Sequence, residues 1–102
     1  MLVRIHEVEQ QGFKEIVVAL CDTELIGKTL SDDFFVNPRF YQGEHLRNKR
    51  ALDVIRGASM VNAIGNKSVS FLIKHGFVKE NETVRIDGVM HAQIFVVEER
   101  RT

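Results

Sequence analysis

The side chains that could do chemistry in this chain lie in a few short segments. The segment "CDTELIGKT", from Cys21 to Thr29, joins a thiol and a carboxylate to a Gly-Lys-Thr triplet. A phosphate-binding P-loop would need a glycine five residues before Gly27, where Asp22 stands, and its carboxylate would repel phosphate. We therefore expect no P-loop here, but a short helical turn that ends at Gly27 in the left-handed conformation.

Cys21 beside Asp22 could be a nucleophile with its base, because a thiolate needs a nearby base or cation to form near neutral pH. The alternative is a small buried hydrophobe at the end of an apolar strand. The four histidines show neither a pair at helical ligand spacing nor a Cys-x-x-Cys companion. We expect no metal and no cofactor, and a small enzyme that uses Cys21 or His91 stays an alternative function.

The segment "VRIDGVMHAQIFVV", residues 84–97, predicts a β-hairpin with a type I′ turn at Asp87-Gly88. A two-residue loop fixes the register, which places Val84 opposite His91 and would place Glu82 opposite Gln93. Two interpretations of His91 and Gln93 stay open. Either they are packed polar groups that bond to backbone or to Glu82, or they form a surface recognition site.

The segment "HLRNKRALDVIRGA" predicts an amphipathic helix, because its apolar residues recur at intervals of three and four positions. Its basic residues fall largely on the other side. They could contact phosphates while Phe40 and Tyr41 upstream offer stacking faces, or they could simply form a solvated surface. The candidate nucleic-acid contacts are Arg47, Lys49, Arg50 and Arg56.

The composition excludes several classes of protein. Fourteen Lys and Arg balance fourteen Asp and Glu, so global charge selects no partner. The single cysteine cannot form an internal disulfide, which favours a cytoplasmic location, and no apolar run approaches the 18 residues of a membrane span. We expect one soluble domain over residues 1–102 that needs no disulfide or metal to fold.

The order of elements predicts an α+β fold: a mixed, largely antiparallel sheet with two main helices packed on it and a C-terminal β-hairpin. We expect a strand over residues 2–8, a turn over 9–12 and a central strand that ends at Cys21. The stretch around Pro38 is expected to be an edge strand or ordered loop. A strand in "SMVNAIG" precedes a helix that Asn66 caps and that ends at Gly76.

Four segments in this order, "ALCDTELIGKTL", "FYQGE", "MVNAIGNKSV" and "RIDGVMHAQIFVV", resemble the archaeal domain-of-unknown-function family 424. Met90 departs from the family pattern at a position where proline is expected. The matching residues are Cys21, Asp22, Glu24, Leu25, Gly27, Lys28, Phe40, Tyr41, Gly43, Glu44, Asn62, Gly65, Gly88, Val89, His91, Ala92 and Gln93.

The resemblance implies an archaeal cytoplasmic protein of unassigned activity. It also implies a link to translation, because family members are associated with domains similar to the beta subunit of archaeal initiation factor 2. Our leading hypothesis is a non-catalytic module that binds RNA or a protein of the translation apparatus, and a homodimer formed through uncovered strand edges is a third reading. We expect Asn62, His91 and Gln93 to lie close together. The recognition candidates are Asp22, Lys28, Tyr41, Asn62, His91 and Gln93.

Overall fold

The protein is described by a computed structural model over residues 1–95. A six-stranded sheet runs in the order β5-β1-β2-β6-β8-β7. Strand β2 pairs with β6 in parallel, and the other neighbours pair antiparallel, so the sheet is mixed and largely antiparallel, as expected. The strands are β1 (Leu2–Gln10), β2 (Phe13–Cys21), β5 (Glu44–His45), β6 (Met60–Ile64), β7 (Val84–Ile86) and β8 (Val89–Phe95).

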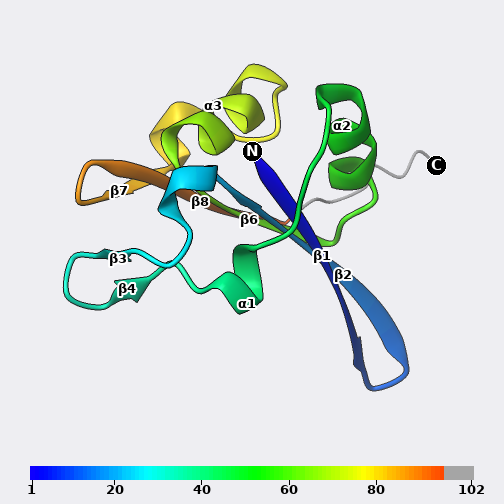
Figure 1. Cartoon of the computed structure of the whole chain (residues 1–102). Coiled ribbons are helices and arrows are strands. Elements are labelled where there is room, and N and C mark those ends of the chain that lie inside the picture. The colour runs from blue at the N-terminus through cyan, green and yellow to red at the C-terminus, as the bar shows by residue number, and fades with distance from the viewer. Residues whose placement is uncertain (96–102) are drawn as a thin grey trace.

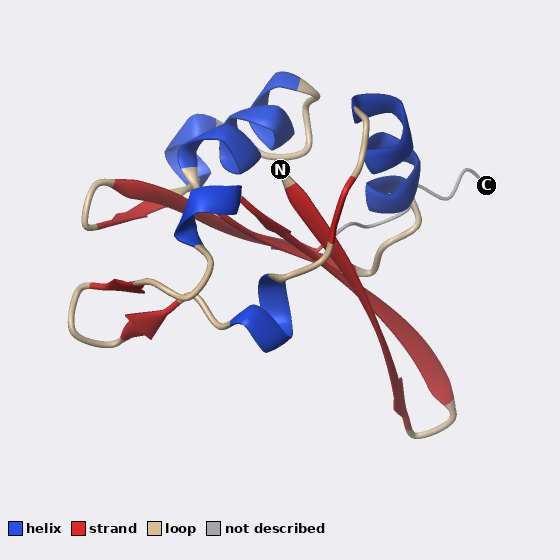
Figure 2. Cartoon of the chain, viewed as in Figure 1, coloured by secondary structure: helices blue, strands red, loops and turns tan. Residues whose placement is uncertain are grey.

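The sheet has a helical face and a ladder face, and both carry apolar cores. The helical face is covered by α2 (Asn48–Arg56) and α3 (Asn66–Lys74) (Figure 1). The ladder face is covered by α1 (Pro38–Tyr41) and by the small ladder of β3 (Thr29–Leu30) and β4 (Phe34–Phe35) (Figure 2). Alternation along each strand sends successive side chains to opposite faces, so Leu20 packs under the helices and Cys21 under the ladder.

The turns of the β1–β2 and β7–β8 hairpins each contain two consecutive residues with positive φ. Gln11 and Gly12 have φ of 50° and 83°, and Asp87 and Gly88 have φ of 53° and 77°. These values suit the type I′ turn, whose twist matches that of the flanking strands. Strand β1 continues to Gln10, so the first turn begins two residues later than expected.

The register expected for the second hairpin is confirmed, with Val84 opposite His91. The expected pairing of Glu82 with Gln93 is wrong. Glu82 lies in the short 3-10 helix η2 (Glu80–Glu82), where its Oε1 accepts a hydrogen bond of 2.9 Å from the Lys79 N–H. This local turn gives the Lys79 N–H an acceptor, and strand β7 therefore begins only at Val84, after Glu82.

Pro38 begins helix α1, so the expectation of an edge strand or ordered loop is wrong at this residue, although Phe34–Phe35 in the same stretch form the edge strand β4. The Asn37 Oδ1 accepts a hydrogen bond of 2.9 Å from the Arg39 N–H, and proline suits the first helical position because its missing N–H would have no partner there. The chain then crosses the edge of β1, from the ladder face to α2. At this crossing a Cβ on Gly43 would overlap the backbone carbonyl of Val3, so only glycine fits without movement.

Helix α3 ends as its sequence predicts. Gly76 has φ of 80°, and the Phe77 N–H donates a hydrogen bond of 2.9 Å to the Leu72 carbonyl. Phe77 packs against the core of the helical face, which is the apolar contact typical of this helix end. Among residues 1–95, no helix is long and apolar enough to cross a membrane.

Candidate binding surfaces

Asp22 holds the N-terminus of helix α3. Its Oδ1 accepts hydrogen bonds from the Ser68 N–H (2.8 Å) and the Ser68 hydroxyl (2.7 Å), and its Oδ2 accepts one from the Lys67 N–H (3.0 Å). The side chain is 4% exposed. The expected cap by Asn66 is therefore wrong, because a carboxylate from a neighbouring strand already occupies the helix N-terminus, where a negative charge is most favourable. The same carboxylate blocks this position for an external anion.

Gly65, which precedes α3, has φ of 121°, and a Cβ there would overlap the Asp22 carboxylate. Two hydrogen bonds also connect the start of α3 to strand β8. The Gly65 N–H donates to the Met90 carbonyl (2.8 Å), and the Asn66 Oδ1 accepts from the Met90 N–H (2.8 Å). Asn66 thus bonds to a strand, and three of the segments that carry the family resemblance meet at this point of the fold.

Asn62, His91 and Gln93 share the ladder face, as expected. Asn62 is directly opposite Gln93 across the β6–β8 pair, and His91 lies two positions along β8. The Tyr41 hydroxyl donates a hydrogen bond of 2.5 Å to the Asn62 Oδ1, and Tyr41 itself is 4% exposed. Gln93 is exposed, and its amide nitrogen lies 3.5 Å from the Met60 sulfur. The Tyr41 and Asn62 side chains thus join α1 to the sheet.

His91 is half-buried beneath the small ladder. Its ring meets the Phe34 ring edge to face, with centroids 5.3 Å apart. The Nε2 atom is buried without a hydrogen-bond partner among the described residues. Burial lowers the pKa of His91 below its usual value, because the charged imidazolium would lose hydration here. His91 therefore packs as a neutral ring in a site that leaves one nitrogen unpaired.

Cys21 has the surroundings of a core residue. It is fully buried, and its thiol donates to the Asp22 backbone carbonyl at 3.1 Å. Burial, together with the negative charges of Asp22 and Glu24, raises the pKa of Cys21 to about 12. Burial also raises the pKa of Tyr41, and the nearby Cys21 adds to this shift. A nucleophilic cysteine needs the opposite, a lowered pKa and access.

Lys28 is exposed between η1 (Thr23–Leu25) and β3. Its backbone orders this loop, since its N–H donates to the Leu25 carbonyl (3.0 Å) and its carbonyl accepts from the Val36 N–H (2.8 Å). No polar contact of its side chain occurs among the described residues. Residues 1–95 also include no cluster of three or more His, Cys, Asp or Glu side chains that could hold a metal ion.

The basic residues predicted on one helix are joined by exposed cations of a second helix on the same side of the sheet. Ala51 and Ile55 of α2 are buried, while Arg47, Lys49, Arg50 and Arg56 are all exposed. Helix α3 adds the exposed Lys67 and Lys74 on the same side of the sheet (Figure 1). Residues 46–79 contain seven basic residues and a single acidic one, Asp53, although the whole chain is neutral. We name the exposed cations of α2 and α3, with the Arg47 that precedes α2, the basic surface. A charge count by segment would have revealed it.

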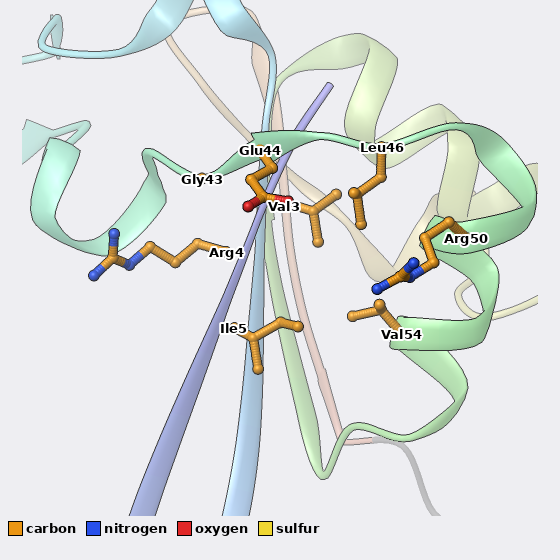
Figure 3. A pocket seen from close by; sticks show the side chains of 8 residues that line it. All are labelled: Val3, Arg4, Ile5, Gly43, Glu44, Leu46, Arg50 and Val54. Carbon is orange, nitrogen blue, oxygen red and sulfur yellow. The ribbon is translucent and has the colours of Figure 1, made fainter.

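Within residues 1–95, hollows open on both faces of the sheet. The first, of about 280 Å³, lies between β1, β5 and α2, and the Arg50 side chain is directed into it (Figure 3). The second, of about 290 Å³, lies on the ladder face beyond α1, where Val17, Met60 and Phe95 line it. The residues that line the first hollow are Val3, Arg4, Ile5, Gly43, Glu44, Leu46, Arg50 and Val54.

Comparisons with known proteins agree with this architecture. The family model "Protein of unknown function (DUF424)" matches residues 11–97. The solved structure of an uncharacterized conserved protein from Methanopyrus kandleri is similar, with a TM-score of 0.78 and 26% sequence identity. The similarity covers 99% of this chain and 95% of that chain. No curated protein matches the sequence.

Proposed function

Since the chain belongs to the DUF424 family, proteins of unknown function, we propose its function from its own surfaces. It is a non-catalytic binding module that contacts RNA through the basic surface of α2 and α3. The single observation that carries the proposal is the segregation of charge in a neutral chain. Following the family resemblance, we place the module in the cytoplasm with RNA of the translation apparatus as its partner.

The charge segregation is strong enough to act on a polyanion. Seven basic residues and one acidic residue in residues 46–79 contrast with four basic and eight acidic residues in residues 1–45. Each Lys or Arg that contacts a phosphate releases counterions, so several such contacts add to the affinity for a polyanion. A net charge of zero therefore does not prevent the helical side from attracting RNA.

The arrangement favours a polymer over a small phosphate ligand. The N-terminus of α3 is occupied by Asp22, so the usual anion site of a helix is already filled. The cations are exposed and are spread over two helices, from Arg47 to Lys74. Of the four arginine and lysine residues in the α2 segment, three are arginines, which suit the planar recognition of phosphate oxygens.

The ladder face supports the non-catalytic part of the proposal. The Cys21 thiol is buried, with its pKa raised far from the neutral range, which removes the most reactive group of the chain from solution. His91 lies under Phe34 with its pKa lowered, and no carboxylate or hydroxyl bonds to its buried Nε2 among the described residues. A catalytic histidine would need a substrate proton within hydrogen-bond reach.

A salt titration with a matched control tests the proposal. Binding to a fluorescent single-stranded RNA is measured by anisotropy for the natural chain and for two quadruple alanine variants. The first replaces Arg47, Lys49, Arg50 and Arg56 on α2. The control replaces Lys14, Lys28, Arg39 and Arg85, which are also exposed but lie outside the basic surface. Both variants change the net charge equally, so only position distinguishes them.

We expect the α2 variant to bind at least about tenfold more weakly at low salt. Its slope of log affinity against log salt should fall by about 0.7 for each lost phosphate contact with a single strand. The control should bind as the natural chain does. Equal losses of affinity in both variants would contradict a localised RNA-binding surface. Absence of RNA binding by the natural chain at 50 mM salt would contradict the RNA proposal and favour a protein partner.

A further inference from the structure

The outer edge of strand β1 is open over most of its length. Strand β2 pairs with all nine residues of β1 on one side, but on the other side β5 pairs only with Leu2 and Val3. Among residues 1–95, no other strand pairs with the segment from Arg4 to Gln10 on this edge. An unpaired strand of seven residues exposes backbone donors and acceptors that readily template pairing with another strand.

We propose that a second copy of this chain occupies this edge, with the two β1 strands antiparallel about a two-fold axis at Glu7. The open segment selects this register. Strand β5 blocks the edge at Val3, and the turn at Gln11 ends the strand at the other side. Only a register centred on Glu7 uses all seven open positions, and it places Arg4 opposite Gln10, Ile5 opposite Glu9 and His6 opposite Val8.

Charge complementarity supports this occupant. Glu7 and Glu9 point to the helical face, because they alternate in phase with Val3. Arg50 of α2 is directed into the hollow that Ile5 also lines (Figure 3). In the proposed register the Glu9 carboxylate of one copy lies opposite Ile5 of the other, at the hollow that holds Arg50. Neither Arg50 nor Glu9 has an ion-pair partner among the described residues.

The apolar contacts across the axis also favour this pairing, whereas the two like-charged Glu7 side chains at the axis oppose it. Ile5 is 51% exposed and Val8 is 41% exposed, and pairing would cover part of both side chains. The two Glu7 residues meet at the axis, where each has its own Lys14 with an ammonium nitrogen 3.8 Å from the carboxylate. The dimer proposal does not rest on the RNA proposal. In the dimer Arg50 pairs with Glu9 of the second copy in place of a phosphate, and the other cations of the basic surface stay exposed.

Cross-linking at the axis tests the register. Residues directly opposite in an antiparallel pair have Cα atoms about 4.5 to 5.5 Å apart, which a disulfide can span. We expect the Glu7→Cys variant, free of RNA, to form a disulfide-linked dimer under mild oxidation. Glu9→Cys is the control, because the two positions 9 lie about 13 Å apart along the strands. The natural chain should not cross-link, since Cys21 is buried.

A charge exchange tests the ion pair. Sedimentation equilibrium of the natural chain should show a reversible dimer, and Glu9→Arg or Arg50→Glu alone should weaken it at least about tenfold. The double variant with both substitutions restores the pair across the axis and should dimerise within about threefold of the natural chain. A chain that sediments as a monomer at all concentrations up to 1 mM, or equal cross-linking at positions 7 and 9, would overturn the proposal.

Discussion

The contact between Asp22 and the start of α3 leads to a quantitative prediction about Gly65. The Asp22 carboxylate accepts three hydrogen bonds at a buried helix N-terminus. A hydrogen bond to a charged group contributes about 1.5 to 3 kcal/mol, and loss of a helix cap costs up to about 2 kcal/mol. Because these contributions overlap, we expect Asp22→Ala to lower the free energy of unfolding by about 3 kcal/mol.

Gly65→Ala should cost more than Asp22→Ala, for two separable reasons. Alanine at φ of 121° adopts a backbone conformation that costs about 2 kcal/mol. Its Cβ would also overlap the Asp22 carboxylate and push it off the helix, with the loss of about 3 kcal/mol derived above. In the Asp22→Ala background only the backbone cost remains. The two substitutions should therefore show a coupling free energy of about 3 kcal/mol.

Urea unfolding followed by circular dichroism measures all four members of this double-mutant cycle. Ser68→Ala is a milder variant that removes only the hydroxyl hydrogen bond to Asp22, and we expect it to cost about 1 kcal/mol. Where Gly65→Ala does not fold, Ser68→Ala still measures how much the hydrogen bonds of Asp22 contribute to stability. A Gly65→Ala cost that is the same in both backgrounds would refute the argument that the glycine exists to admit the carboxylate.

Three further predictions follow from the ladder face. Because burial raises the pKa of Cys21 to about 12, iodoacetamide at pH 8 should label Cys21 only in denaturant; labelling of the folded chain at the rate of a free thiol would contradict its burial. Because burial lowers the pKa of His91 below the usual 6.5, the unfolded chain takes up a proton first as the pH falls. The stability from neutral His91 is therefore complete above about pH 6.5 and is lost below it, and pH-dependent urea melts of His91→Gln should show a shallower decline between pH 7 and 5 than the natural chain. Tyr41→Phe leaves the Asn62 Oδ1 without its hydroxyl donor and should cost about 1 to 2 kcal/mol, whereas an unchanged urea midpoint would show that water replaces the hydroxyl freely.

Much of the fold could be predicted from local sequence signals. The Asp87-Gly88 pair specifies the hairpin and its register, because few other residues accept two consecutive positive φ angles. The spacing of Ala51 and Ile55 identifies the buried side of α2, and Gly76 with Phe77 marks the end of α3. Each of these signals lies within one element, where backbone geometry and side-chain period act over a few residues.

One error occurred where a distant residue competes with a local one, and two occurred where a local turn or cap competes with a strand pattern. Asn66 is a good helix cap by type, but Asp22 of another segment reaches the same helix end and carries a full negative charge. Glu82 could have continued a strand, but its bond to the Lys79 N–H forms a turn first. Pro38 was expected in an edge strand or loop because it cannot donate to a central strand pair. The Asn37 cap instead makes Pro38 the first residue of a helix.

For the candidate sites, the sequence by itself determined the residue types and the faces on which they lie. The period of two along a β-strand placed His91 and Gln93 on one face, the glycine-marked turns predicted that Asn62 lies close to them, and the spacing in α2 predicted that its cations are exposed. Tertiary structure decided what these side chains contact: Tyr41 bonds Asn62, Phe34 covers His91, and α3 extends the basic surface. It also left the edge of β1 open. Pairing and burial between segments far apart in the chain depend on the packing of whole elements, which no local pattern encodes.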